Sequence, residues 1–211
     1  MRLLVVTAVD AERDAILAAA HGAGAGGLEV LVGGVGPAEA AAATAFRLAA
    51  EAYDLVISAG IAGGFTPLQT GDIAVAASIV FADLGADSTE GFRPVSALGF
   101  GGERYDVVPR LAVELADCTG GHLGTILTVA TVTGSAERAD TLIARHPDAV
   151  AEAMEGAGVA AAAARAGVPV AEVRAISNTV GPRDRAAWRI PEALAALGTA
   201  IAAIDAAELT S

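Results

Sequence analysis

The sequence contains no lysine, one cysteine and few aromatic residues, and each shortage excludes a class of protein. All of its side-chain positive charge comes from thirteen arginines, set against 25 acidic residues, so the net charge is −12 at pH 7. A chain this acidic does not present the positive surface that binds nucleic acids or anionic membranes. We therefore expect neither nucleic acid nor a membrane as a partner.

The single cysteine, Cys118, cannot form a disulfide within the chain, which fits a reducing compartment. Long hydrophobic runs are also missing. The apolar run from Leu3 to Val9 meets charged residues too early for a signal peptide. The apolar stretches at 156–164 and 193–204 are shorter than a membrane-spanning helix. These features predict a cytoplasmic protein.

Alanine, rather than large aromatic residues, supplies much of the hydrophobic composition, which is 54% of the chain. Alanine forms helices readily but buries little surface per residue. A chain of 211 residues is long enough to bury a core as one domain, and we expect a single domain over 1–211. Because large core residues are scarce, we also expect a homodimer or a larger homo-oligomer.

Strand-like and helix-like segments alternate along most of the chain. The expected strands are 2–7, 28–32, 54–58 followed by a tight glycine segment at 59–64, 72–84, 124–130, a short one near 150, and 169–176. The expected helices are 10–20, 37–51, 135–146, one that begins at 156, and 190–208. The region between the two central strands is expected to form loops. This order predicts an α/β fold with a mixed central sheet flanked by helices.

Two glycine-rich segments resemble phosphate-binding turns, but neither fits the dinucleotide fingerprint. The segment 22–27 lies between a helix and a strand, the reverse of the order that the fingerprint needs, and is expected to be a turn. The turn at 34–36 has the right context, but Glu39 stands where a third small residue belongs. Metal binding has little support, because no ligand spacing links the histidines at 21, 122 and 146. We expect no cofactor and no metal.

Three polar residues are candidates by their position alone. Glu12 follows the first strand, at the edge where α/β sheets build their sites, although a glutamate in a first helical turn is better explained by the helix dipole. Glu155 has apolar neighbours, and a carboxylate in such surroundings usually has a partner. Asn178 is expected just past the carboxyl end of the strand at 169–176.

Six short segments resemble, in their order and spacing, the nucleoside phosphorylase/nucleosidase superfamily and its methylthioadenosine nucleosidase branch. They are 7–12, 33–36, 58–64, 71–73, 153–155 and 173–178. The resemblance implies a three-layer fold in which Glu12 activates water, Glu155 binds the ribose hydroxyls, and Asn178 contacts the purine. It also implies substrate contacts from Ile61, Ala62, Gly63, Thr133, Arg138, Met154 and Arg183.

Asn178 departs from this branch, whose members carry an aspartate at that position. An amide presents one donor group and one acceptor to the same edge of a purine. O6 of a 6-oxopurine accepts from the amide NH₂, while protonated N7 donates to the amide oxygen. An aspartate would face O6 with acceptors alone, which leaves buried polar groups unpaired. The sequence therefore predicts hypoxanthine or guanine, rather than adenine, as the leaving base.

Residues around the third strand favour water over phosphate as the nucleophile. Phosphorylases of this superfamily carry an arginine ahead of the glycine segment and a hydroxyl residue within it. Here 54–58 contains no arginine, and Ile61 follows Gly60. A phosphate dianion would lack a cation and would be repelled by Glu12. We therefore expect hydrolysis of an N-glycosidic bond.

Two further segments, 177–185 with Trp188 and 131–138, resemble the futalosine hydrolase subgroup. Its substrate joins hypoxanthine to a sugar with a carboxyphenyl ketone, and its reaction belongs to menaquinone biosynthesis. Three alternatives stay open: a methylthioadenosine/S-adenosylhomocysteine nucleosidase, a purine nucleoside phosphorylase, and a non-catalytic nucleoside-binding protein. Also open are the residue that stacks on the purine and the arginine, among 104, 183 and 185, that binds the substrate carboxylate.

Overall fold

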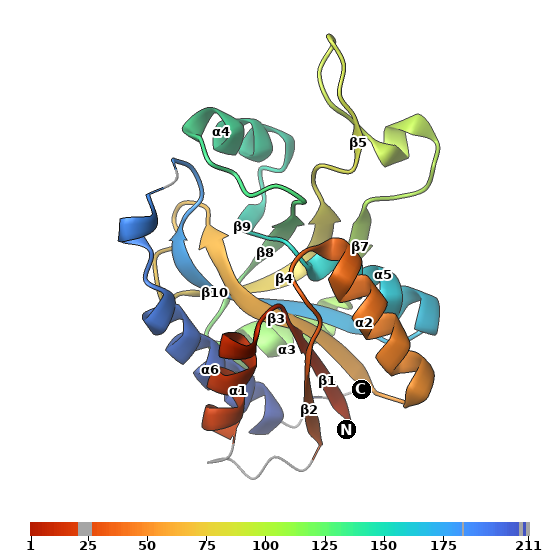
Figure 1. Cartoon of the computed structure of the whole chain (residues 1–211), viewed down its shortest axis with the longest axis vertical. Coiled ribbons are helices and arrows are strands. Elements are labelled where there is room, and N and C mark those ends of the chain that lie inside the picture. Colours follow the sequence, from red (N-terminus) through yellow and green to blue (C-terminus); the bar gives the residue numbers. More distant parts are fainter. Residues whose placement is uncertain (21–26, 183, 207–208, 210–211) are drawn as a thin grey trace.

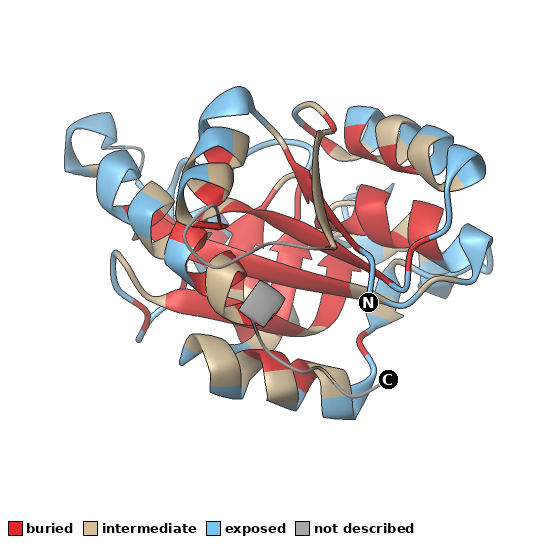
Figure 2. Ribbon diagram, turned by 90° about the horizontal axis from the view of Figure 1, so that it is seen from below, coloured by how far each residue is buried: buried red, intermediate tan, exposed pale blue. Residues whose placement is uncertain are grey.

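The computed structural model describes residues 1–20, 27–182, 184–206 and 209. An eight-stranded mixed sheet forms its centre, and helices cover both faces (Figures 1 and 2). The strands of this sheet are β1 (Leu3–Thr7), β2 (Leu28–Val32), β3 (Leu55–Gly64), β4 (Ile73–Phe81), β7 (Arg104–Asp106), β8 (His122–Thr128), β9 (Ala149–Ala153) and β10 (Val170–Thr179). The prediction of an α/β fold with a mixed sheet between helices is confirmed.

Part of the sheet closes into a ring. β3 pairs in parallel with β10, β10 pairs antiparallel with β4, and β4, β8 and β9 continue in parallel. β9 then returns to β3 in a short antiparallel ladder, Gly63 with Glu152 and Gly64 with Ala151. β1 and β2 extend the sheet from β3, and β7 adds to β4. The ends of β3, β9 and β10 are thereby held beside one another.

The helices form two groups, one on each face of the sheet (Figure 1). They are α1 (Asp10–Ala20), α2 (Pro37–Ala50), α3 (Pro109–Thr119), α4 (Ala136–Arg145), α5 (Gly156–Ala166) and α6 (Ile190–Ala206). α1 and α3 pack against α6, whereas α2 packs against α5. α4 lies apart, near the small hairpin of β5 (Gly85–Ala86) and β6 (Arg93–Pro94). Within the described segments, no helix has the length and apolarity to cross a membrane.

Three expectations about local structure were wrong. The glycine segment 59–64 continues β3, because its ladder with β10 runs on to Gly64. For the same reason β10 extends to Thr179, so Asn178 lies within a strand, just after a register shift. The loop expected between the central strands contains α3, which Gly120 ends in a left-handed conformation. Of the glycine turn expected at 22–27, residues 22–26 lie outside the described part of the chain.

The contact between α2 and α5 depends on a residue without a side chain. A Cβ atom added at Gly158 would overlap the carbonyl oxygen of Pro37 and would lie 2.9 Å from its Cα. Because both atoms belong to backbone, neither can rotate away. The small residues of α5 therefore allow the two helices to approach closely, and each helix begins directly after a residue of the site described below, Gly36 before α2 and Glu155 before α5.

We expect Gly158→Ala to lower the free energy of unfolding by about 1–3 kcal/mol, because the added methyl group overpacks this contact. Chemical denaturation of the wild type and the variant measures the difference. Gly102→Ala is the matched control, since a Cβ there meets no atom within 4 Å and its backbone is not left-handed. Equal stability of the Gly158 variant and the wild type would contradict the close contact.

Candidate active site

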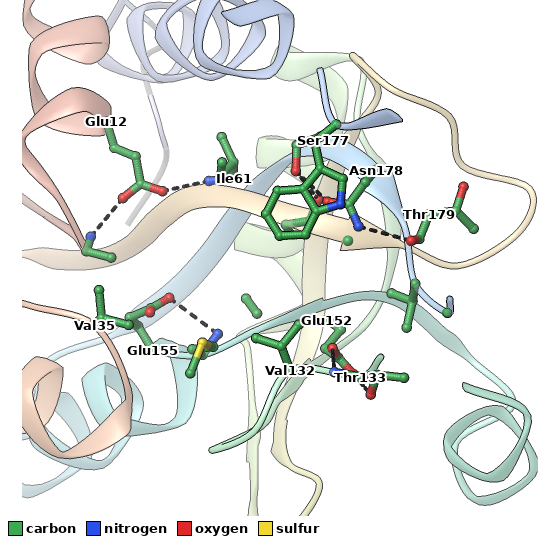
Figure 3. A pocket seen from close by; sticks show the side chains of 18 of the residues that line it. Glu12, Val35, Ile61, Val132, Thr133, Glu152, Glu155, Ser177, Asn178 and Thr179 are labelled. Carbon is green, nitrogen blue, oxygen red and sulfur yellow. Dashed lines mark hydrogen bonds between the residues drawn. The ribbon is translucent and has the colours of Figure 1, made fainter. Parts of the chain in front are cut away.

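A pocket of about 330 Å³ opens beside the carboxyl ends of β1, β3, β9 and β10 (Figure 3). Most of the residues predicted to form the site line this pocket: Glu12, Ile61, Ala62, Gly63, Thr133, Met154, Glu155 and Asn178. Figure 3 shows Glu12 and Glu155 toward one end of the pocket, and Asn178 and Glu152 toward the other. The structure thus brings together residues from distant parts of the sequence.

The structure places one predicted site residue elsewhere and does not describe another. Arg138, on α4, lies in a separate depression, where its guanidinium is 3.5 Å from the carboxylate of Asp83. Arg183 lies outside the described residues. Of the other arginines considered for the substrate carboxylate, Arg104 pairs with Asp106 on β7, away from the pocket. Arg185 lies 5.8 Å from the ring centre of Trp188, which does line the pocket.

Glu12 is held in place by backbone N–H groups from two segments. Oε2 accepts hydrogen bonds from Ala8 and Val9, at 2.9 and 3.3 Å, in the turn between β1 and α1. Oε1 accepts from Ile61 of β3 at 2.9 Å. The residue is 4% exposed. A carboxylate accepts about four hydrogen bonds, so this fixed group retains capacity for one more, such as that of a water molecule.

Glu155 lies at the junction of β9 and α5 and contacts two other segments, the turn before α2 and strand β10. Its Oε1 accepts the N–H of Gly36 at 3.2 Å, and glycine suits that turn because its φ is 91°. Its Oε2 accepts the N–H of Met154 at 3.3 Å and lies 3.1 Å from the guanidinium of Arg174. Arg174 is the partner that the apolar surroundings of Glu155 require.

Arg174 is fully buried beneath the pocket, and its guanidinium is shared among several acceptors. Besides the ion pair with Glu155, its Nε donates to Glu172 at 2.8 Å and its Nη2 donates to Ser58 at 3.0 Å. Burial by itself lowers the pKa of Arg174, but the nearby glutamates outweigh that effect and raise it. The arginine is therefore a permanent cation inside the sheet.

Two neighbours of Arg174 show how tightly this cluster is built. A Cβ atom at Gly60 would lie 2.6 Å from Arg174 Nη1 and 2.6 Å from Glu12 Oε1, so the glycine leaves room for both charged groups. Glu172 is completely buried, and burial raises its pKa although Arg174 is beside it. Its Oε2 makes no hydrogen bond within the described structure. The end of the pocket that contains Glu12 and Glu155 is thus packed against the buried guanidinium of Arg174.

The amide of Asn178 is oriented by its chain neighbours. Its Nδ2 donates to the carbonyl oxygen of Thr179 at 3.0 Å, and its Oδ1 accepts from the hydroxyl of Ser177 at 2.8 Å. A carbonyl oxygen only accepts hydrogen bonds, so it identifies the nitrogen side of the amide. One N–H and one lone pair of the amide stay available for a ligand.

Glu152 was not among the predicted site residues, but its carboxylate lines the pocket. The residue is 5% exposed and accepts hydrogen bonds from the N–H of Thr133, at 2.8 Å, and from its hydroxyl. Burial raises the pKa of Glu152, and the bonds from Thr133 act in the opposite direction.

Trp188 is the aromatic residue among the described lining residues.

Sequence reasoning also missed the supporting residues Arg174, Glu172 and Ser177. A signal for the first two was present, because an arginine and a glutamate two positions apart in an apolar strand share one face and need each other as partners. Glu152 has no such signal, since its partner Thr133 lies on a separate loop.

The charges of the pocket have one sign. Glu12, Glu152 and Glu155 line it, whereas no arginine or histidine does so among the described residues. No group of three metal-binding side chains occurs in the described segments either. Such a pocket favours a group that gains positive charge and disfavours a phosphate dianion.

We expect Arg174→Met to lower the free energy of unfolding by about 3–5 kcal/mol, because it leaves the buried carboxylates of Glu172 and Glu155 without their cation. Denaturant titration measures this loss. Arg110→Met is the control, because its ion pair with Glu114 is exposed and contributes about 0–1 kcal/mol. Similar losses in the two variants would show that the buried cluster does not hold the fold together.

Comparison with known proteins places this geometry in a family. The model of the phosphorylase superfamily matches residues 16–209. Futalosine hydrolase of Streptomyces coelicolor is 52% identical, over 95% of this chain and 94% of that protein. Futalosine hydrolase of Acidothermus cellulolyticus is 47% identical, over 98% and 91%. The structure of 5'-methylthioadenosine/S-adenosylhomocysteine nucleosidase from Neisseria meningitidis superposes with a TM-score of 0.83 at 20% identity, over 97% and 98% of the two chains. The chain therefore belongs to the phosphorylase superfamily.

Proposed function

We propose that this chain is an N-glycosyl hydrolase that cleaves futalosine into hypoxanthine and dehypoxanthine futalosine. The names of two relatives that cover nearly the whole chain support this substrate. The observation that carries the proposal is the oriented amide of Asn178 at the opposite end of the pocket from Glu12. It offers a 6-oxopurine the donor and the acceptor that its O6 and N7 require.

Glu12 is the proposed base. Its carboxylate is fixed by three backbone N–H groups, so a water molecule bound to it would be held in a defined position. As the glycosidic bond lengthens, the ribosyl ring gains oxocarbenium character and water attacks the anomeric carbon. Glu12 accepts one proton of that water, and the departing hypoxanthine takes up one proton at N7 from solvent, so that the elements of water are added across the broken bond. A positioned general base contributes about 10²- to 10⁴-fold to such a step.

Glu155 and Asn178 act on the two sides of the breaking bond. Glu155, with Met154 beside it, binds the ribose hydroxyls, and its negative charge favours the positive charge that develops on the sugar. Asn178 stabilises the departing purine through N7 and O6. Arg174 contacts none of the reacting atoms in this scheme; it is a positioning residue that fixes Glu155.

Water, rather than phosphate, is the proposed nucleophile. The described lining residues include three carboxylates and no arginine, so a phosphate dianion would meet repulsion without a compensating cation. Arg174 does not supply that cation, because it is buried and already paired with Glu155 and Glu172. Ile61 occupies the position where a hydroxyl would be needed.

The substrate side chain and the assembly are further parts of the proposal. Arg185, beside the lining residue Trp188, is the arginine that we propose for the substrate carboxylate. We propose a cytoplasmic homodimer or larger homo-oligomer, supported by the unpaired Cys118 and by Phe46 and Phe100, each 81% exposed. A single domain over 1–211 is supported by the one sheet that joins β1 to β10.

We expect Glu12→Gln to reduce hypoxanthine release from futalosine by about 100-fold or more, because the amide cannot take the proton of water. Chromatography of the free base measures turnover, and calorimetry with the variant measures substrate binding, which we expect to persist. Glu90→Gln, at an exposed position, is the control and should retain full activity. Full activity of the Glu12 variant would remove this residue from the mechanism.

We expect Asn178→Asp to lower kcat/KM for futalosine by about tenfold or more, because a carboxylate offers O6 of the purine no hydrogen-bond donor.

We also expect the wild type to release base from futalosine in the absence of phosphate. Futalosine, inosine and methylthioadenosine, each with and without phosphate, are the substrates to compare. Base release from methylthioadenosine alone would indicate an adenine-specific nucleosidase, and a requirement for phosphate would indicate a phosphorylase. Release from none would indicate a binding protein.

A further inference from the structure

The mechanism above assigns no role to Glu152, a buried carboxylate in the pocket wall. In the sheet, Gly63 of β3 pairs with Asn178 of β10 on one side and with Glu152 of β9 on the other. The two polar residues are thus two strands apart, about 9.6 Å between backbones at the usual strand spacing. Gly63 contributes no side chain between them, and a Cβ atom there would lie 2.8 Å from Val180 Cγ2 and 3.4 Å from Asn178 Nδ2. Figure 3 shows Asn178 and Glu152 on opposite sides of the pocket.

We propose that Glu152 reads the purine edge opposite Asn178, by accepting the N1–H of a 6-oxopurine. This inference rests on the proposed function and adds a second specificity-determining residue to it. Asn178 would contact O6 and N7, and Glu152 would contact N1. A planar base between the two would then have hydrogen bonds on both of its edges.

The chemistry of N1 distinguishes the two kinds of purine. In hypoxanthine N1 carries a hydrogen and donates, whereas in adenine N1 is an acceptor. After the two bonds from Thr133, the carboxylate of Glu152 still has lone pairs available for a donor. An adenine would place two acceptors opposite each other. Because Glu152 is 5% exposed, little water is present to relieve that mismatch.

The pKa of Glu152 is raised overall, mainly by burial, and hydrogen-bond donors around the carboxylate oppose that rise. Both the N–H and the hydroxyl of Thr133 donate to it, and donors favour the charged form. A bound N1–H would be a further donor to the same group. The base and Thr133 therefore stabilise the same protonation state.

A purely structural role for Glu152 is the competing explanation. Its bonds to Thr133 anchor the loop that leads to Ser135, the N-cap of α4. Loss of an anchor would weaken the binding of every base alike. Loss of a reader of N1 would instead change the ratio of the affinities for hypoxanthine and adenine.

The experiment is calorimetric binding of hypoxanthine, 1-methylhypoxanthine and adenine to the full-length wild type, Glu152→Gln and Thr133→Val. A glutamine can present either a donor or an acceptor to N1. We expect the preference for hypoxanthine over adenine to fall about tenfold in Glu152→Gln, the size of one unsatisfied buried group. Thr133→Val removes part of the anchor, and we expect it to weaken both bases without changing their ratio.

An unchanged ratio in a Glu152→Gln variant that melts cooperatively would overturn the proposal and leave Glu152 as an anchor of the loop. If that variant does not fold, the wild type still decides. We expect it to bind 1-methylhypoxanthine, which lacks the N1–H, at least about tenfold more weakly than hypoxanthine, and equal affinity would overturn the proposal. Absence of turnover with futalosine would contradict the proposed function, whereas these ratios test Glu152 separately.

Discussion

The buried guanidinium of Arg174 is the interaction on which the site depends. It binds Ser58 of β3, Glu172 of its own strand, and Glu155 at the start of α5, so that one cation joins segments far apart in the sequence. A buried charge destabilises the fold unless opposite charges and hydrogen-bond partners surround it. Movement of any one partner away from Arg174 would therefore raise the free energy of the folded state. Because Gly60 has no side chain, Glu12 and this guanidinium both fit against the same point of β3.

This arrangement explains how three glutamates can line one small pocket. Glu12 is compensated by backbone N–H groups, Glu152 by Thr133, and Glu155 by Arg174. Each carboxylate has its own donors, so none relies on a mobile counterion. The pocket remains negative overall, which suits a reaction whose sugar becomes positively charged and whose nucleophile is neutral water. The same charges make the pocket unsuitable for phosphate.

Most elements were predictable where the local pattern was strong, as for α1 and β2, whose bounds agree with the sequence. The continuation of β3 was not, because its glycines resemble a turn locally and are explained only by the charged groups packed against them. α3 was hidden between segments rich in glycine and proline. The ring of strands was also beyond reach, since it depends on pairings between distant segments.

The candidate site was predictable only where a residue lies next to a strand that the local sequence indicates. Glu12, Glu155 and Asn178 follow recognisable strands, and the resemblance to a family suggested their roles. Glu152 was missed because the alignment of β9 with β3 and β10, rather than any local motif, turns it toward the pocket. Arg174 was predictable as a buried residue, because it lies two positions from Glu172 in an apolar strand.

The short ladder between β3 and β9 has a mechanical consequence. The ring is held closed here by two residue pairs, Gly63 with Glu152 and Gly64 with Ala151, and by the N–H of Phe65, which donates to the carbonyl oxygen of Val150. This ladder borders the pocket. A ligand that contacts both β9 and β10 would bridge this short ladder. It would add contacts at the point where the ring has the fewest paired residues. Ligand binding is then thermodynamically linked to the closure of the ring. Separation of β9 from β3 therefore costs more free energy in the ligand-bound protein than in the free protein.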